Sequence, residues 1–97
     1  MPKIHDFQQT VTLADGVVLN GYAGFNEVAD DLWVWLDEGT DMATAFMLFS
    51  DPARTAVIKV ALTADIVETH YGYTKLALIR EDGGKVTVRL KGGDLVD

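Results

Sequence analysis

The chain has 97 residues, no cysteine and a formal net charge of −7. The length predicts one domain over residues 1–97 with no room for a second, and the lack of cysteine excludes disulfides and thiolate chemistry. Nine acids stand against one base up to Asp51, which makes direct binding to a nucleic-acid backbone unfavourable. No stretch approaches the roughly 20 apolar residues of a membrane helix, and no signal-peptide pattern opens the chain. We therefore expect neither a membrane location nor secretion by a signal of its own.

Two strands are predicted at the start of the chain. Runs with strand character at 4–13 and 17–23 flank Ala14-Asp15-Gly16, and an Asp-Gly pair between such runs is typical of a β-hairpin. Side chains in the first run alternate between apolar and polar, as in a half-buried strand. The apolar face of this run holds His5, Phe7, Val11 and Leu13.

The next predicted strand, at 32–36, has no polar face. Trp33 and Trp35 leave one side of it, and Leu32, Val34 and Leu36 leave the other. Because side chains alternate across a strand, both faces need a cover, and one cover could be a partner chain. The following helix is a natural cover for the other face.

Helical spacing appears next, at Met42, Ala45, Phe46 and Phe49. Thr40 is the expected N-cap, and Pro52 ends the helix near Ser50. Strands follow at 55–62, 66–71, 73–81 and 85–91, the last after a turn at Asp82-Gly83-Gly84. This order predicts an α+β fold, mostly an antiparallel β-sheet or small barrel of about seven strands with one short α-helix. Residues 94–97 are expected to form a disordered tail.

Acidic residues crowd both ends of the tryptophan strand. They are Glu27, Asp30, Asp31, Asp37, Glu38 and Asp41. With Trp33 and Trp35 they predict a partner-binding surface, and a patch of carboxylates can imitate nucleic-acid phosphates in a basic groove. A simpler interpretation is that the acids keep an apolar protein in solution.

The last predicted strand has a basic outer face. Val86, Val88 and Leu90 are expected to point inward, and Lys85, Arg89 and Lys91 outward. If this strand is exposed, the basic face could meet the acidic segment of a neighbouring copy in a ring or filament. Ion pairs within one chain would remove that reason for assembly.

Two sets of side chains are weak candidates for ligand binding. Glu68 and His70 share a strand face and could supply two metal ligands or an oriented base, but no motif offers a third ligand. Tyr71 and Tyr73, with His70 and Tyr22, could stack on a planar ligand. The simpler interpretations are an exposed cross-strand pair and tyrosines with buried rings. We predict no cofactor, no metal and no catalytic residue.

Three spacings carry a resemblance. The chain reads Phe46-x-x-Phe49-Ser50-Asp51-Pro52-x-x-Thr55, then Tyr71-x-Tyr73-Thr74-x-Leu76, after an opening Thr12-Leu13-Ala14-Asp15-Gly16. In these spacings it resembles small uncharacterised proteins encoded by phages and prophages of gut bacteria. The resemblance implies a virion or tail component, an assembly factor or an inhibitor of host defence, located in the host cytoplasm or the virion.

Taken together, these features predict a non-enzymatic interaction module of phage origin. It would assemble with itself as a homo-oligomer or dock on a structural partner of the virion or tail. One alternative is an anti-defence inhibitor, acting as an acidic mimic of nucleic acid or as an oligomeric sponge for a small ligand. A third is a small metal-dependent or histidine-dependent enzyme.

Overall fold

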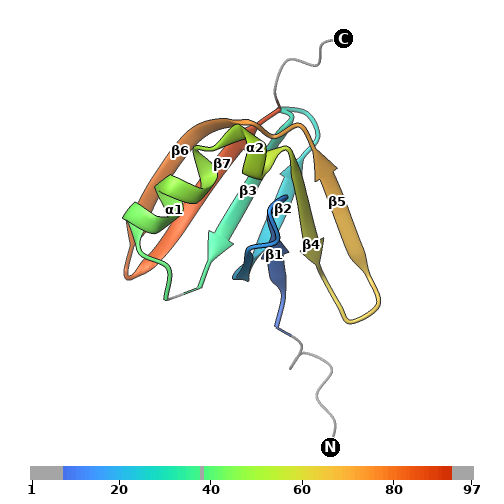
Figure 1. Cartoon of the computed structure of the whole chain (residues 1–97), viewed down its shortest axis with the longest axis horizontal. Coiled ribbons are helices and arrows are strands. Elements are labelled where there is room, and N and C mark those ends of the chain that lie inside the picture. The colour runs from blue at the N-terminus through green and yellow to red at the C-terminus, as the bar shows by residue number, and fades with distance from the viewer. Residues whose placement is uncertain (1–7, 38, 93–97) are drawn as a thin grey trace, which may run out of the picture.

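The computed structural model describes residues 8–37 and 39–92. Within these residues the chain forms seven strands and two short helices (Figure 1). Their order is β1 (Thr10–Thr12), β2 (Val18–Asn26), β3 (Asp31–Leu36), α1 (Met42–Phe49), α2 (Pro52–Thr55), β4 (Val57–Ala61), β5 (Val67–Tyr71), β6 (Lys75–Asp82) and β7 (Lys85–Lys91). The expectations for His5, Phe7, Glu38 and the tail at 94–97 fall outside the described residues.

All strand pairs are antiparallel, in the order β5-β4-β1-β2-β3-β7-β6. β2 joins the two halves of the sheet, because residues 18–20 pair with β1 and residues 21–26 pair with β3. Gly21 stands where the partner changes. A Cβ at this position would overlap the backbone carbonyl oxygen of Trp35, so only glycine allows this close approach.

The two edge strands of the sheet are neighbours in the chain. Only residues 72–74 connect β5 to β6. Such a link spans at most about 14 Å, so the two edges approach each other at this end. The ring of Phe25 in β2 also lies 5.6 Å, between centroids, from the ring of His70 in β5. The sheet therefore curls around a common core and remains open along its edges (Figure 1).

The predicted antiparallel sheet of about seven strands is confirmed in this coarse form, with two helices where one was expected. The inward faces predicted for the first and last strands are also correct at the described positions, which are Val11 and Leu13 in the first and Val86, Val88 and Leu90 in the last. The buried apolar side chains are Val11, Leu13, Leu32, Val34, Leu36, Ala45, Leu48, Phe49, Ile58, Val60, Tyr73, Val86, Val88 and Leu90.

Helix α1 begins one residue later than predicted. The Oδ1 atom of Asp41 accepts a hydrogen bond from the Thr44 backbone N–H at 2.7 Å, so Asp41 is the N-cap and the prediction of Thr40 was wrong. Pro52 ends α1 as expected but also opens α2, because proline suits the first turn of a helix. This second helix replaces the predicted start of β4.

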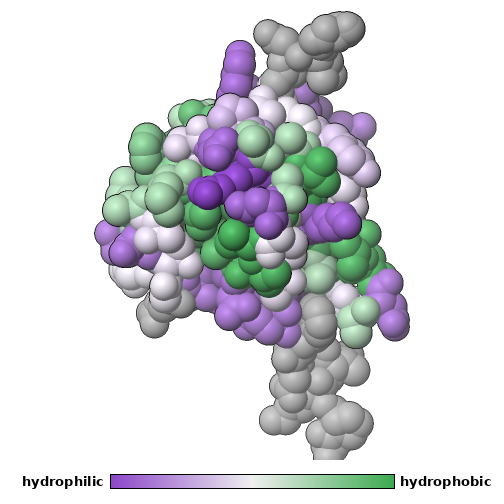
Figure 2. Space-filling view, in the orientation of Figure 1, coloured by the Kyte–Doolittle hydropathy of each residue, from purple (hydrophilic) through white to green (hydrophobic). Residues whose placement is uncertain are grey.

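The buried side of α1 also differs from the prediction. The helix buries Ala45, Leu48 and Phe49 against the core and packs on β6 and β7. Phe46, which the spacing placed inward, is 53% exposed. Seven of the eight residues of α1 are apolar, so the sequence does not define which stripe faces the core. Figure 2 shows the resulting apolar surface over α1.

Candidate functional site

Among the described residues, no helix or strand covers the outer side of the interior strand β3. β3 lies between β2 and β7, and its even-numbered side chains are buried in the core. Trp33 and Trp35 point the other way and are half-buried, while Tyr22 of β2, opposite Trp35, is 51% exposed. We call the surface formed by Tyr22, Trp33, Trp35 and Arg89 the aromatic face. The strand predicted to need two covers thus receives one from residues 8–37 and 39–92.

The rings of the aromatic face hold one another in place. Trp33 and Trp35 are nearly parallel, at 12° with centroids 6.1 Å apart, and Tyr22 lies 5.4 Å from Trp35. A Cβ on Gly24 would lie 3.1 Å from the Trp35 ring, so this glycine lets the indole rest on the main chain of β2. Arg89 completes the set, with its guanidinium carbon 5.6 Å from the Trp33 centroid. Side chains fixed in this way lose little entropy on binding.

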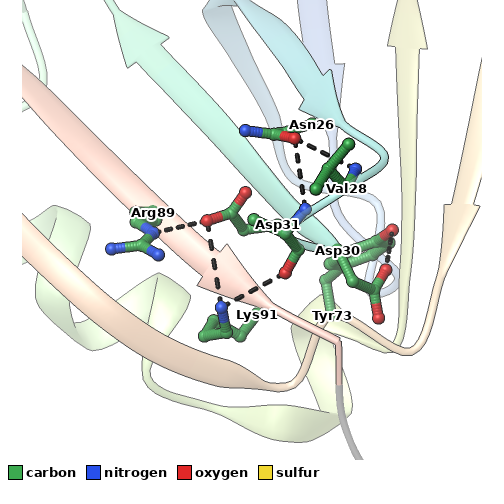
Figure 3. A network of polar contacts seen from close by, with 8 residues as sticks. Asn26, Val28, Asp30, Asp31, Tyr73, Arg89 and Lys91 are labelled. Atoms are coloured by element: carbon green, nitrogen blue, oxygen red, sulfur yellow. Dashed lines mark hydrogen bonds and ion pairs between the residues drawn. The ribbon is translucent and has the colours of Figure 1, made fainter.

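A buried carboxylate positions Arg89. The Nε atom of Arg89 donates to Oδ2 of Asp31 at 2.6 Å, and the Asp31 side chain is only 2% exposed. Lys91 Nζ lies 4.0 Å from the same oxygen and donates to the Ala29 carbonyl at 3.2 Å (Figure 3). Within the described residues, Oδ1 of Asp31 is buried with no hydrogen-bond partner. The geometry of the aromatic face therefore depends on an incompletely satisfied carboxylate.

A hollow adjoins the aromatic face beside Trp35. It has a volume of about 190 Å³ and combines apolar walls with charged groups. Its lining residues are Tyr22, Trp35, Leu36, Asp37, Asp82, Lys85, Val86 and Thr87. A cavity of this size accepts a side chain of a partner more readily than a cofactor, because cofactor sites are typically larger.

Three of the acids predicted to bind a partner have roles inside the chain. Asp30 accepts a hydrogen bond from the Tyr73 hydroxyl at 3.0 Å, and Asp31 pairs with Arg89. Asp41 caps α1, and the hydrogen bonds from Thr44 lower the pKa of its carboxyl group. These carboxylates stabilise the fold of the protomer.

The remaining acids lie at opposite ends of β3. Glu27 is exposed in the turn between β2 and β3, whereas Asp37 follows the far end of β3 and accepts a hydrogen bond from Gln8. Glu38 is outside the described residues. The structure therefore does not gather the acids into one patch.

The basic residues of β7 are distributed differently from the expectation for an exposed edge. β7 lies between β3 and β6, so it is an interior strand. Arg89 and Lys91 both approach Asp31 of the same chain, which removes the reason for a contact between this face and a neighbouring acidic segment. Lys85 remains exposed at the rim of the hollow.

The Glu68 and His70 pair forms as predicted. His70 Nε2 lies 3.4 Å from Glu68 Oε1, on the inner side of β5. Across the described ranges, no group of three or more histidines or acids is placed to hold a metal ion. The pair thus has no third ligand in this part of the chain.

The tyrosines do not form one stacking platform. Tyr73 is buried beside Phe25 and His70, and its ring centroid lies 6.1 Å from each of theirs. Burial, and to a smaller extent the hydrogen bond to Asp30, raises the pKa of the Tyr73 hydroxyl to about 12. Tyr71 is 70% exposed on the outer side of β5, opposite to the side that carries His70. Tyr22 lies on the aromatic face, a placement that the sequence analysis missed. Pairing β2 with β3 across their turn would have placed Tyr22 opposite Trp35.

No helix in the described part of the chain is long and apolar enough to cross a membrane. The chain matches no protein-family model, and neither a curated protein nor a solved structure matches it.

Proposed function

We propose that this chain is a non-enzymatic interaction module whose aromatic face docks a partner protein. The observation that carries the proposal is the stacked pair Trp33 and Trp35, held half-buried on an interior strand of the sheet beside an exposed Tyr22. Tryptophan, tyrosine and arginine are the residues that most often dominate binding energy in protein interfaces. A fixed aromatic cluster beside a small hollow is suited to such a contact.

The charges around the aromatic face indicate the chemistry of the partner. By strand register, Arg89 and Lys91, which lie near Asp31, share this face with three further cations of β6 and β7 that are exposed, Lys75, Arg80 and Lys85. A partner with carboxylates at its rim and an apolar side chain for the hollow would complement this arrangement. Asp31, Asp37 and Asp82 interrupt the basic surface, and the net charge of −7 opposes a nucleic acid. A protein partner is therefore favoured.

The phage resemblance makes a virion or tail protein the partner that we would test first. The alternative of acidic mimicry has less support, because Asp30, Asp31 and Asp41 make contacts within the chain. The small-ligand sponge and the histidine-dependent enzyme would need a site around Glu68 and His70.

Site-specific photo-crosslinking in the cells that make the protein tests this proposal. A photoreactive phenylalanine analogue replaces Tyr22 in one variant and Val28 in the control, which is 98% exposed in the turn between β2 and β3. We expect one defined adduct with an acidic protein at position 22 and none at position 28. Equal adducts at both positions, or none at position 22, would contradict docking through the aromatic face.

A further inference from the structure

The two edges of the sheet differ in how well they are protected from pairing. At one edge, β6 has a bulge between Leu76 and Leu78 and exposed charges at Lys75 and Arg80. Such features hinder a further strand from adding to an edge. At the other edge, β4 is the only one of the described strands that pairs with β5, and β5 contains no bulge, proline or lysine. β5 is therefore the edge open to another strand.

The hydrogen bonds between β4 and β5 show which backbone groups are free. The Leu62 N–H donates to the Ile66 carbonyl at 2.9 Å, and the Gly72 N–H donates to the Ala56 carbonyl at 2.8 Å. In an antiparallel ladder, residues alternate in the side to which their N–H and C=O groups point. Even-numbered residues of β5 thus bond to β4, and Val67, Thr69 and Tyr71 direct their backbone groups toward the open edge.

We propose that two copies of this chain pair through their β5 strands, antiparallel and centred on Thr69. In this register Val67 of each copy lies opposite Tyr71 of the other, and Thr69 lies opposite its own equivalent. All three residues with free backbone groups then form ladder hydrogen bonds. The seven-stranded sheet of one copy continues into that of the second.

The pairing of Glu68 with His70 selects this register over its neighbours. Centring on Thr69 places Glu68 of one copy opposite His70 of the other, at a position without ladder hydrogen bonds where side chains lie closest. Shifting the centre by one residue in either direction would instead place Glu68 opposite Glu68, or His70 opposite His70. Two carboxylates at such positions are destabilising, and a register with His70 opposite His70 loses both Glu68–His70 pairs. The strand Val-Glu-Thr-His-Tyr is thus complementary to itself.

Apolar contact adds to the pairing. Val67 is 55% exposed and Tyr71 is 70% exposed, and an aromatic side chain opposite a β-branched one is a favourable cross-strand pair. The two-fold contact uses the same surface on both copies and closes at a dimer. It uses a different surface from the aromatic face and does not depend on the partner proposed there.

Native mass spectrometry of the full chain and a Thr69→Pro variant tests the dimer. The Thr69 N–H points to the open edge, so proline removes no hydrogen bond to β4 and blocks only the added strand. We expect dimers for the wild type and for a Thr69→Ala control, and monomers for Thr69→Pro with an unchanged circular dichroism spectrum. A monomeric wild type, or a Thr69→Pro variant that remains dimeric, would overturn the proposal. Crosslinking at position 22 should be the same in Thr69→Pro, which separates this test from that of the aromatic face.

A charge exchange tests the register. Glu68→Lys and His70→Glu should each weaken the homodimer, because the first removes the carboxylate that pairs with His70 and the second places carboxylates opposite one another. When the two variants are mixed, the introduced lysine lies opposite the introduced glutamate and the other cross-strand pair remains Glu68 with His70, so heterodimers should dominate the mass spectrum. A statistical mixture of homodimers and heterodimers would contradict pairing centred on Thr69.

Discussion

Arg89 and Asp31 join β7 to the first residue of β3 through a contact of 2.6 Å between Nε and Oδ2. The contact has two consequences, because Asp31 is buried and Arg89 also lies over the Trp33 ring. It neutralises a carboxylate that the fold removes from water, and it fixes a cation beside the stacked indoles. Stability and the shape of the aromatic face are therefore linked at this pair.

Replacing Arg89 by Met should destabilise the fold by about 2 to 3 kcal/mol, because it leaves the buried Asp31 carboxylate without its closest partner. Lys91→Met is the matched control. The Lys91 Nζ atom lies farther than Arg89 from Asp31 Oδ2, at 4.0 Å, so the Lys91→Met variant should lose less than about 1 kcal/mol of unfolding free energy. Urea unfolding measures both values. Equal losses in the two variants would mean that Arg89 is not the main partner of Asp31.

Tyr73→Phe should cost about 1 kcal/mol, since it removes the hydroxyl that donates to Asp30. The effect should depend on pH. The folded-state pKa of Tyr73 is raised from 10.0 to about 12, so the unfolded chain loses the tyrosine proton first as the pH rises through this range. The wild type should then lose on the order of 2 kcal/mol of stability that the phenylalanine variant keeps. A difference between the two proteins that is constant from neutral pH to about pH 12 would contradict this assignment.

Gly21→Ala should prevent the bend of β2 or destabilise the fold by more than about 3 kcal/mol, because the added Cβ would overlap the Trp35 carbonyl oxygen in a backbone that cannot shift freely. Gly16→Ala is the comparison. Gly16 has a φ of 93°, and no heavy atom lies within 4 Å of the position that a Cβ would take, so alanine there should cost only about 1 kcal/mol of backbone strain. Thermal unfolding distinguishes the two. A Gly21→Ala protein as stable as Gly16→Ala would show that the sheet tolerates a wider spacing at the bend.

Asp41→Asn should lower the melting temperature at neutral pH, because the charged cap of α1 accepts a hydrogen bond and favours the helix N-terminus. The pKa of Asp41 is lowered from 3.8, so the contribution of the charge is present above that value and is lost as the pH falls through the folded pKa. The wild type and the variant should converge in strong acid. A difference that persists there would assign the effect to something other than the carboxylate charge.

Much of the secondary structure follows from local patterns. The alternation in β7 predicted its buried and exposed sides, since Val86, Val88 and Leu90 are fully buried. The turn at Gly83 and Gly84 was also predictable, because both glycines have positive φ, at 64° and 84°, as a two-residue hairpin turn requires.

Long-range relationships were not accessible from the same patterns. Nothing local indicates that Asp31 is buried beside Arg89, because the two residues are 58 positions apart and meet only through the pairing of β3 with β7. The exposure of Phe46 could not be predicted either, since an almost uniformly apolar helix can bury any of its sides. The position of β5 at an open edge depends on the strand order of the whole sheet.

The affinity of the protein captured at position 22 tests the central claim most directly. Isothermal titration of that protein into the wild type, a Tyr22→Ala variant and a Val28→Ala control would report the contribution of the aromatic face. We predict a loss of at least about tenfold in affinity for Tyr22→Ala and no change for Val28→Ala, since interface aromatics commonly contribute more than 1 kcal/mol. Equal affinities for all three chains would contradict docking through Tyr22, Trp33 and Trp35.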